Sequence, residues 1–167
     1  LVDEGAGDAA NPFDHVLVFH SLSKRSNLPG LRSGFVAGDP TLIAEFNRLR
    51  SYGGPASPLP VYAAAAAAWN DEAHVEESRV LYRQKFDLAE EIIGDRFGFY
   101  RPEGGFFLWL DVGDSEAAAL KLWQDAGVRT LPGFYLASTD AAGFNPGAGY
   151  LRLALVEGLD RTAEAFR

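Results

Sequence analysis

Apolar runs and stretches of helical periodicity alternate along the chain and predict a mixed α/β fold. Residues 15–20 form a short apolar run that is typical of a buried strand. A polar loop follows, and residues 32–38 (RSGFVAG) predict a second strand. Between positions 40 and 52 apolar residues recur three or four apart, and Pro40 suits the first turn of a helix. The first 12 residues, rich in Gly, Ala and acid, indicate a loop.

The rest of the chain begins with a long helical pattern from about Leu59 to Phe97, which includes six consecutive alanines. The Asn70-Asp71 pair is a candidate interruption that caps a second helix. Residues 98–113 are aromatic and β-rich, with a turn at Pro-Glu-Gly-Gly. We expect the remaining elements to be a helix at 115–126 with Ser115 as its N-cap, strands at 128–132 and 150–156, and a last helix at 159–167 with Asp160 near its cap.

These elements fall into two parts. Residues 1–71 hold the strand–loop–strand–helix portion, and residues 72–167 are expected to form a smaller C-terminal α/β domain. The sequence begins at Leu1 and contains no methionine, so we expect it to be a fragment of a longer polypeptide.

Composition narrows the class of protein. The chain has 167 residues, 47% of them hydrophobic, which is enough for a sizeable core. Its net charge of −8 argues against nucleic acid or an anionic membrane surface as a partner. No apolar run approaches the roughly 20 residues of a membrane helix. The absence of cysteine excludes a thiol nucleophile and makes the cytoplasm the expected location. Acidic residues near position 72 indicate a solvated helix face, so we predict no metal site.

The stretch HSLSKRSNLPGLRSGF, residues 20–35, contains serine, lysine and arginine side chains in a combination that indicates a binding site rather than an ordinary loop. Lys24 follows a predicted strand, where ligand sites of α/β proteins lie. Partial burial and the nearby Arg25 and Arg32 disfavour an ammonium ion, and a neutral amine is what adds to a carbonyl group. Arg25 itself is expected to tune the field of the site or to form an ion pair at the surface. Lys24 is therefore a candidate for covalent attachment of a carbonyl compound.

Groups around this lysine suit a phosphate. Ser21 and Ser23 offer hydroxyl donors, and Arg32 offers a planar fork that matches phosphate oxygens. Pyridoxal 5′-phosphate carries both an aldehyde and a phosphate, and its enzymes hold it through a lysine Schiff base. A nucleotide P-loop is excluded because the pattern GxxxxGK[ST] is absent.

The lysine motif resembles that of the fold-type I, class I/II aminotransferases, in which Ser-Leu-Ser-Lys is followed by an arginine eight residues later and then Ser-Gly. The resemblance extends to PEGGFFLWLD (102–111), VRTLPG (128–133) and YLRLA (150–154), which occur in the family's order. HSLSKRSNLPGLRSGFVAGD is most similar to the aspartate-type and N-succinyl-diaminopimelate aminotransferases. The fold implied is part of the large pyridoxal-phosphate-binding domain, a mixed sheet with helices, followed by a small C-terminal α/β domain.

The resemblance also implies roles for single residues. Lys24 matches the Schiff-base lysine, which also transfers the substrate proton, while Ser21 and Arg32 match ligands of the cofactor phosphate. Gly34 matches a small residue at a close backbone approach. Arg152 matches the arginine that binds the substrate α-carboxylate, and an arginine within an apolar strand needs an anionic partner or an exposed face in any case. The alternative for Arg152 is an ion pair with Glu157 or Asp160.

The implied function is transfer of an amino group between an amino acid and a 2-oxo acid such as 2-oxoglutarate, in amino-acid biosynthesis, by a homodimer. One part of the family pattern is missing. No aspartate matches the residue that faces the pyridine nitrogen, since Asp3, Asp8 and Asp14 lie in the loop-like start or at the edge of the first strand. We expect the fragment alone to be inactive.

Two alternatives share the lysine motif. One is a pyridoxal-phosphate-dependent C–S lyase or decarboxylase of the same fold. The other is a non-enzymatic, aminotransferase-like effector domain of a transcription regulator. The segment GGPASPLP, where a second carboxylate-binding arginine could lie, contains no arginine, which slightly favours another way of recognising the substrate side chain.

Overall fold

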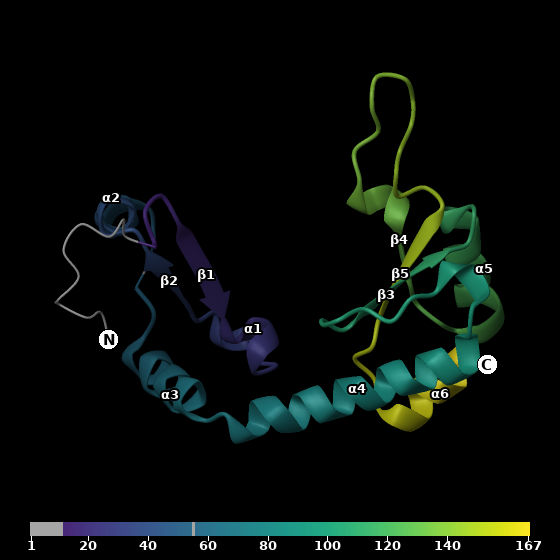
Figure 1. The fold of residues 1–167 in the computed structure, drawn as a ribbon, viewed down its shortest axis with the longest axis horizontal. Coiled ribbons are helices and arrows are strands. Elements are labelled where there is room, and N and C mark those ends of the chain that lie inside the picture. The colour runs from purple at the N-terminus through teal and green to yellow at the C-terminus, as the bar shows by residue number, and fades with distance from the viewer. Residues whose placement is uncertain (1–11, 55) are drawn as a thin grey trace. The chain divides into compact units, whose positions relative to one another are not determined.

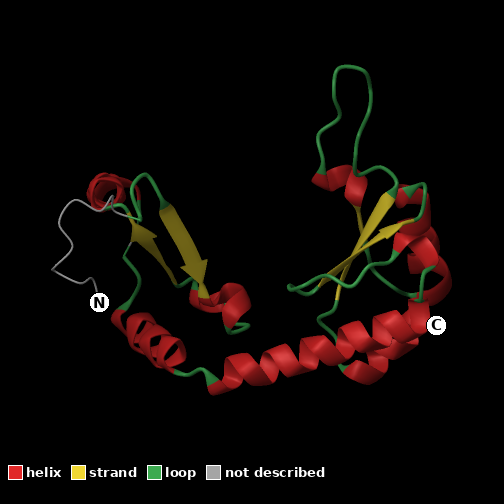
Figure 2. Ribbon diagram, viewed as in Figure 1, coloured by secondary structure: helices red, strands yellow, loops and turns green. Residues whose placement is uncertain are grey.

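The computed structural model describes residues 12–54 and 56–167 (Figures 1 and 2). Asp3, Asp8 and most of the loop predicted at the start lie outside the described residues. Helices and short strands alternate along the described chain, so the predicted α/β class is confirmed. No helix in the part of the chain that the structure describes is long and apolar enough to cross a membrane.

Two compact units make up the chain, Leu1–Glu77 and Ser78–Arg167. The division falls within helix α4 (Ala73–Ile93), a few residues after the predicted boundary at residue 71. The assignment of the two parts to a large and a small domain stays a prediction.

The first unit is built on an antiparallel pair of strands, β1 (Leu17–Ser21) and β2 (Gly34–Gly38), in which Ser21 lies opposite Gly34. The segment between them is more ordered than the predicted loop. It contains the one-turn helix α1 (Leu22–Arg25) and the 3₁₀ turn η1 (Pro29–Leu31). Strand β2 begins two residues later than predicted, because Arg32 has a left-handed backbone conformation that a strand does not accept.

Strand β1 was predicted to be buried, and within the described residues it is not. Val18 is 51% exposed and Phe19 is 65% exposed. Strand β2 is the only strand paired with β1 among the described residues. Phe19 packs its ring edge-on against Phe46 at 5.8 Å, which covers only part of the side chain. Apolar composition identified the strand but not what covers it.

Three helices follow in the predicted positions: α2 (Pro40–Gly53), α3 (Leu59–Asn70) and α4. Their ends agree with the capping signals. Pro40 occupies the first turn of α2, and the predicted break at Asn70-Asp71 is confirmed. Asp71 Oδ1 accepts the backbone N–H of Ala73 (2.9 Å) and thereby caps α4.

Asp39 is the N-cap of α2 and is buried. Its carboxylate accepts backbone N–H groups from His15, Thr41 and Leu42. These bonds hold the pKa of Asp39 below its usual value of 3.8, and the bond from His15 has the largest effect. Ligand atoms of Asp14, His15 and Asp39 lie within 4.8 Å of one another, but the Asp39 oxygens already serve the helix cap, so we assign no metal to this cluster.

The second unit contains a three-stranded antiparallel sheet with the order β3-β5-β4. The strands are β3 (Phe107–Asp111), β4 (Leu131–Pro132) and β5 (Tyr150–Ala154). The helices are α5 (Ser115–Ala126) and α6 (Leu159–Phe166), and the 3₁₀ turns are η2 (Arg96–Gly98) and η3 (Gly133–Leu136). The core of the unit lies between α4 and the sheet and consists of Phe86, Ala89, Ile93, Leu108, Leu110 and Leu155.

Details of the second unit differ from the sequence-based expectation, and the strand expected at 128–132 is reduced to the two residues of β4. The N-cap of α5 is Asp114, whose carboxylate accepts the N–H groups of Glu116 and Ala117, and Ser115 is instead fully buried. A carboxylate one residue earlier can reach the free N–H groups, so it displaces serine from the role. In α6 the N-cap is Gly158, and Asp160 lies near it in the first turn, as expected.

Candidate functional site

The polar segment after β1 lines an open pocket of about 800 Å³ in the first unit. Ser21, Ser23, Lys24 and Arg32 all contribute to its wall. The structure thus brings together the three residues predicted to bind a cofactor, Ser21, Lys24 and Arg32. Pairing of β1 with β2 explains this, because it places the two ends of the intervening segment side by side.

Lys24 is the third residue of helix α1, and local hydrogen bonds determine where that helix begins. Ser21 ends β1 with extended backbone angles and acts as N-cap, its Oγ accepting the N–H of Ser23 (3.2 Å). Leu22 is completely buried and donates its N–H to the carbonyl of Ser33 (3.1 Å). Lys24 itself is exposed among the described residues, so the partial burial expected for it is not observed.

Arg32 has a left-handed backbone conformation, with φ 50° and ψ 38°. For a residue other than glycine this costs about 1 kcal/mol, and such residues are frequent at functional sites. Two hydrogen bonds to the carbonyl of Pro29 hold Arg32 in place, one from its backbone N–H (3.3 Å) and one from Nη1 (3.0 Å). The remaining guanidinium N–H groups are available to the pocket that the side chain lines.

Gly34 allows the two strands to approach closely beside the pocket. A Cβ atom at this position would lie 2.6 Å from the carbonyl oxygen of His20 and 3.1 Å from Cβ of Ser21. The first distance is shorter than real Cβ atoms show, and its partner is a backbone atom, so only glycine fits without a shift of the backbone. The predicted close backbone approach at Gly34 is therefore present.

Aromatic side chains support the strands next to the pocket. His20 of β1 and Phe35 of β2 lie edge-on to each other (5.7 Å between ring centroids) and both contact the ring of Trp69, at 5.2 and 5.0 Å. His20 and Phe35 also line the pocket. The sequence did not predict the far wall of the pocket, which is formed by Phe46, Asn47, Arg50, Ser57 and Tyr62. The only sequence signal was the helical spacing of the first three on α2.

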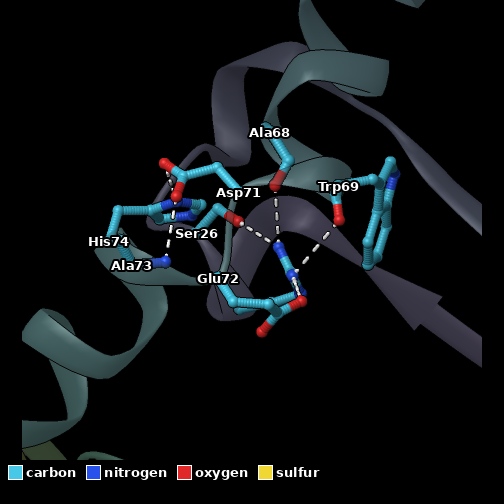
Figure 3. A network of polar contacts seen from close by, with 8 residues as sticks. Ser26, Ala68, Trp69, Asp71, Glu72, Ala73 and His74 are labelled. Carbon is cyan, nitrogen blue, oxygen red and sulfur yellow. Dashed lines mark hydrogen bonds and ion pairs between the residues drawn. The ribbon is translucent and has the colours of Figure 1, made fainter.

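Arg25 differs from the sequence-based interpretation. Its ion pair with Glu72 is present, but the Arg25 side chain is only 9% exposed rather than at the surface. Figure 3 shows the surrounding network, in which the carbonyls of Ala68 and Trp69 and the hydroxyl of Ser26 gather around one guanidinium group. Glu72, interpreted from sequence as part of a solvated face, is thus a partner of this group. No sequence pattern indicated these contacts, since they join positions more than 40 residues apart.

Arg152 lies in β5, in the second unit, and is half-buried. Its guanidinium carbon lies 4.5 Å from the centre of the Phe107 ring. The alternative ion pairs are not formed within the described residues, because Glu157 pairs with Arg161 (3.7 Å) and Asp160 has no salt bridge there. The arginine therefore has no anionic partner in the described part of the chain.

The residues that line the pocket fit pyridoxal 5′-phosphate. A lysine amine suits its aldehyde, and the hydroxyl of Ser21 together with the guanidinium of Arg32 suits its phosphate. Gly34, which has no side chain, also lines the pocket.

Comparison with known proteins agrees with the geometry. A family model described as aminotransferase class I and II matches residues 5–165. The chain is 38% identical over 154 residues to 4-dedimethylamino-4-oxo-anhydrotetracycline transaminase OxyQ of Streptomyces rimosus, covering 91% of the chain and 41% of OxyQ. It is 30% identical to an LL-diaminopimelate aminotransferase of Syntrophobacter fumaroxidans, covering 88% of the chain and 37% of that protein.

A solved structure of an aminotransferase from Neisseria meningitidis superposes with a TM-score of 0.86 at 46% identity. The match covers 92% of the chain and 39% of that structure's chain. The chain therefore spans about two fifths of the length of the relatives it matches.

We predict that Gly34→Ala destabilises the full-length protein by about 1–3 kcal/mol, because the new methyl group forces β1 and β2 apart. Gly30→Ala is the matched control, since a Cβ at position 30 meets nothing within 4 Å. Urea unfolding monitored by circular dichroism measures both variants. Equal midpoints for the two variants would contradict the close approach.

Proposed function

The chain belongs to the class I and II aminotransferases, and from this membership we propose that the full-length protein is a transaminase that transfers an amino group from an amino acid to a 2-oxo acid such as 2-oxoglutarate. Members of this family use pyridoxal 5′-phosphate. The observation that carries the proposal is the common pocket of Ser21, Lys24 and Arg32, which offers an amine beside phosphate-binding groups. The C–S lyase and regulator alternatives have no observation of their own to favour them.

Lys24 is the proposed catalytic residue. When bound, pyridoxal phosphate supplies an electron-withdrawing ring that makes the α-hydrogen of an attached amino acid acidic. Lys24 Nζ would hold the cofactor through its aldehyde carbon. The freed amine then acts as a general base and removes the proton from the substrate Cα. Its place on a capped helical turn that lines the pocket supports both roles.

Ser21 and Arg32 are the proposed phosphate ligands. Arg32 supplies two parallel N–H groups and a permanent positive charge, which match two phosphate oxygens. Ser21 supplies a hydroxyl at the end of β1, opposite Gly34. The left-handed backbone of Arg32, which is strained for a residue other than glycine, agrees with a role at a functional site.

Arg152 is the proposed ligand of the substrate α-carboxylate. A half-buried guanidinium without an anionic partner among the described residues has a desolvation cost that a bidentate carboxylate would offset. In this proposal the guanidinium lies over the Phe107 ring and its planar edge would bind the carboxylate.

The amino donor that we propose is aspartate or an N-succinyl-diaminopimelate-like amino acid. The transaminase from Streptomyces rimosus and the one from Syntrophobacter fumaroxidans are named for chemically different substrates, so family membership gives the reaction type rather than the donor. A homodimer, a cytoplasmic location, and a large domain at 1–71 with a small one at 72–167 belong to the same proposal.

Borohydride reduction of the cofactor-loaded full-length protein is expected to leave a stable label on the peptide that contains Lys24, because reduction fixes the linkage to its amine. Lys24→Ala is expected to abolish both the label and the visible absorption band. Lys121→Ala, which removes an exposed lysine of α5, is the control and should keep both. A label on any other lysine would falsify the role of Lys24.

Arg32→Gly is expected to weaken cofactor affinity by about 10- to 100-fold, the effect of losing a charge-assisted hydrogen-bond pair. The apo protein should be as stable as the parent or more so, because glycine relieves the left-handed backbone strain. Arg32→Lys keeps the charge without the fork and should be intermediate. Equilibrium dialysis and thermal melting measure the two effects. Unchanged affinity in Arg32→Gly would exclude the phosphate contact.

Arg152→Gln is expected to lower kcat/KM for the amino donor by about 10- to 100-fold, because a neutral amide replaces a bidentate partner of the carboxylate. Cofactor content should not change. Arg161→Gln, in which an exposed ion pair of the same unit is removed, is the matched control. Equal kinetic constants in Arg152→Gln and Arg161→Gln would refute the assignment.

A further inference from the structure

We propose that Arg25 is a positioning residue for Lys24, whose guanidinium group fixes the helical turn that carries the lysine to the end of helix α3. The inference rests on the proposed function, because the position of Lys24 affects a rate only if Lys24 reacts. It concerns the residue next to the lysine, which the sequence indicated as a field-tuning or surface residue.

Helix α1 cannot hold its own position. It has four residues, and a single helical turn is unstable without tertiary contacts. Its start is fixed by the Ser21 cap and by the buried side chain of Leu22. Lys24 lies beyond both of these contacts and is exposed. The other end of the turn is fixed where Arg25 reaches α3.

The contacts of Arg25 are directional. Nη1 donates to the carbonyl of Ala68 (2.9 Å) and to Ser26 Oγ (3.2 Å), and Nη2 lies 3.5 Å from the carbonyl of Trp69. Both carbonyls belong to the last turn of α3, where they lack partners within the helix and carry partial negative charge. Arg25 therefore caps α3 while α3 holds Arg25, as the network in Figure 3 shows.

Burial distinguishes the carbonyl contacts of Arg25 from its ion pair with Glu72. The Arg25 side chain is 9% exposed, whereas the side chain of its ion-pair partner Glu72 is 74% exposed. An ion pair open to water contributes little, but buried bonds from a rigid planar group define a position. The guanidinium also stacks on Trp69 at 4.9 Å, and Trp69 contacts His20 and Phe35 beside the pocket.

Loss of these contacts is expected to slow the reaction rather than weaken substrate binding. Arg25 and Lys24 are adjacent, so a shift of the Arg25 main chain shifts the reactive amine. A displacement of about 1 Å at a catalytic group can cost about 100-fold in rate. The guanidinium is engaged by protein groups, and in our proposal the substrate carboxylate binds Arg152 instead.

The test uses the cofactor-loaded full-length protein and L-glutamate, the amino product of the proposed acceptor 2-oxoglutarate. Single-turnover reaction is followed by the visible band of the cofactor. Arg25→Lys keeps the positive charge but loses the planar fork, and its rate constant at saturating glutamate should fall about tenfold or more. The Kd of glutamate should stay within about twofold, since no substrate contact is removed.

Glu72→Gln is the matched control, because it removes the exposed partner and leaves the carbonyl contacts intact. Its rate constant and Kd should both stay within about twofold of the parent values. A wild-type rate in Arg25→Lys, an equal loss in both variants, or a Kd that rises in step with the lost rate would overturn the proposal.

A second variant keeps the test decisive if Arg25→Lys does not retain the cofactor. Ser26→Ala removes one hydrogen bond of the guanidinium and should slow single turnover about two- to fivefold at unchanged Kd. An unchanged rate would overturn the inference in that case. Parent protein that neither shows the visible band nor reacts with glutamate would instead contradict the proposed function.

Discussion

The antiparallel pairing of β1 with β2 is the constraint on which the candidate site depends. It places Ser21 opposite Gly34, so the segment between them must leave one strand and return to the other within a few ångströms. Within that closed segment, Lys24 and Arg32 face a common pocket. If β1 and β2 lay farther apart, the amine of Lys24 and the guanidinium of Arg32 would no longer line the same pocket. The chemistry of the site is thus a consequence of a backbone approach that only glycine permits.

Several polar groups with directional contacts are buried in the described part of the first unit. Few apolar side chains of the first unit are buried among the described residues; Leu22 and Ala65 are two of them. Directional bonds also connect its elements, such as the Asp39 cap of α2 and the Arg25 contacts with α3. Such bonds depend on correct geometry, and they make the position of a side chain more definite than apolar packing does.

Local signals in the sequence predicted most elements and the residues that meet in the pocket. Pro40 and the Asn70-Asp71 pair indicated helix ends because they act on neighbouring backbone groups. The lysine motif indicated Ser21, Lys24 and Arg32, and the structure places these three together. Contacts between distant positions could not be predicted. The burial of Arg25 depends on α3, and the exposure of Phe19 depends on what packs on the sheet. The residues next to Arg25 and Phe19 in the sequence do not indicate either contact.

In the one-turn helix α1, the number of residues between Ser21 and Lys24 determines the direction of the lysine side chain. Each residue of an α-helix rotates the next side chain by about 100°, so Lys24 faces the pocket only because two residues separate it from Ser21. One inserted or deleted residue would turn the amine toward another part of the structure while leaving composition, charge and capping chemistry the same. Among homologous chains, the spacing between the capping serine and the lysine should therefore be far less tolerant of length change than the stretch between the lysine turn and Arg32.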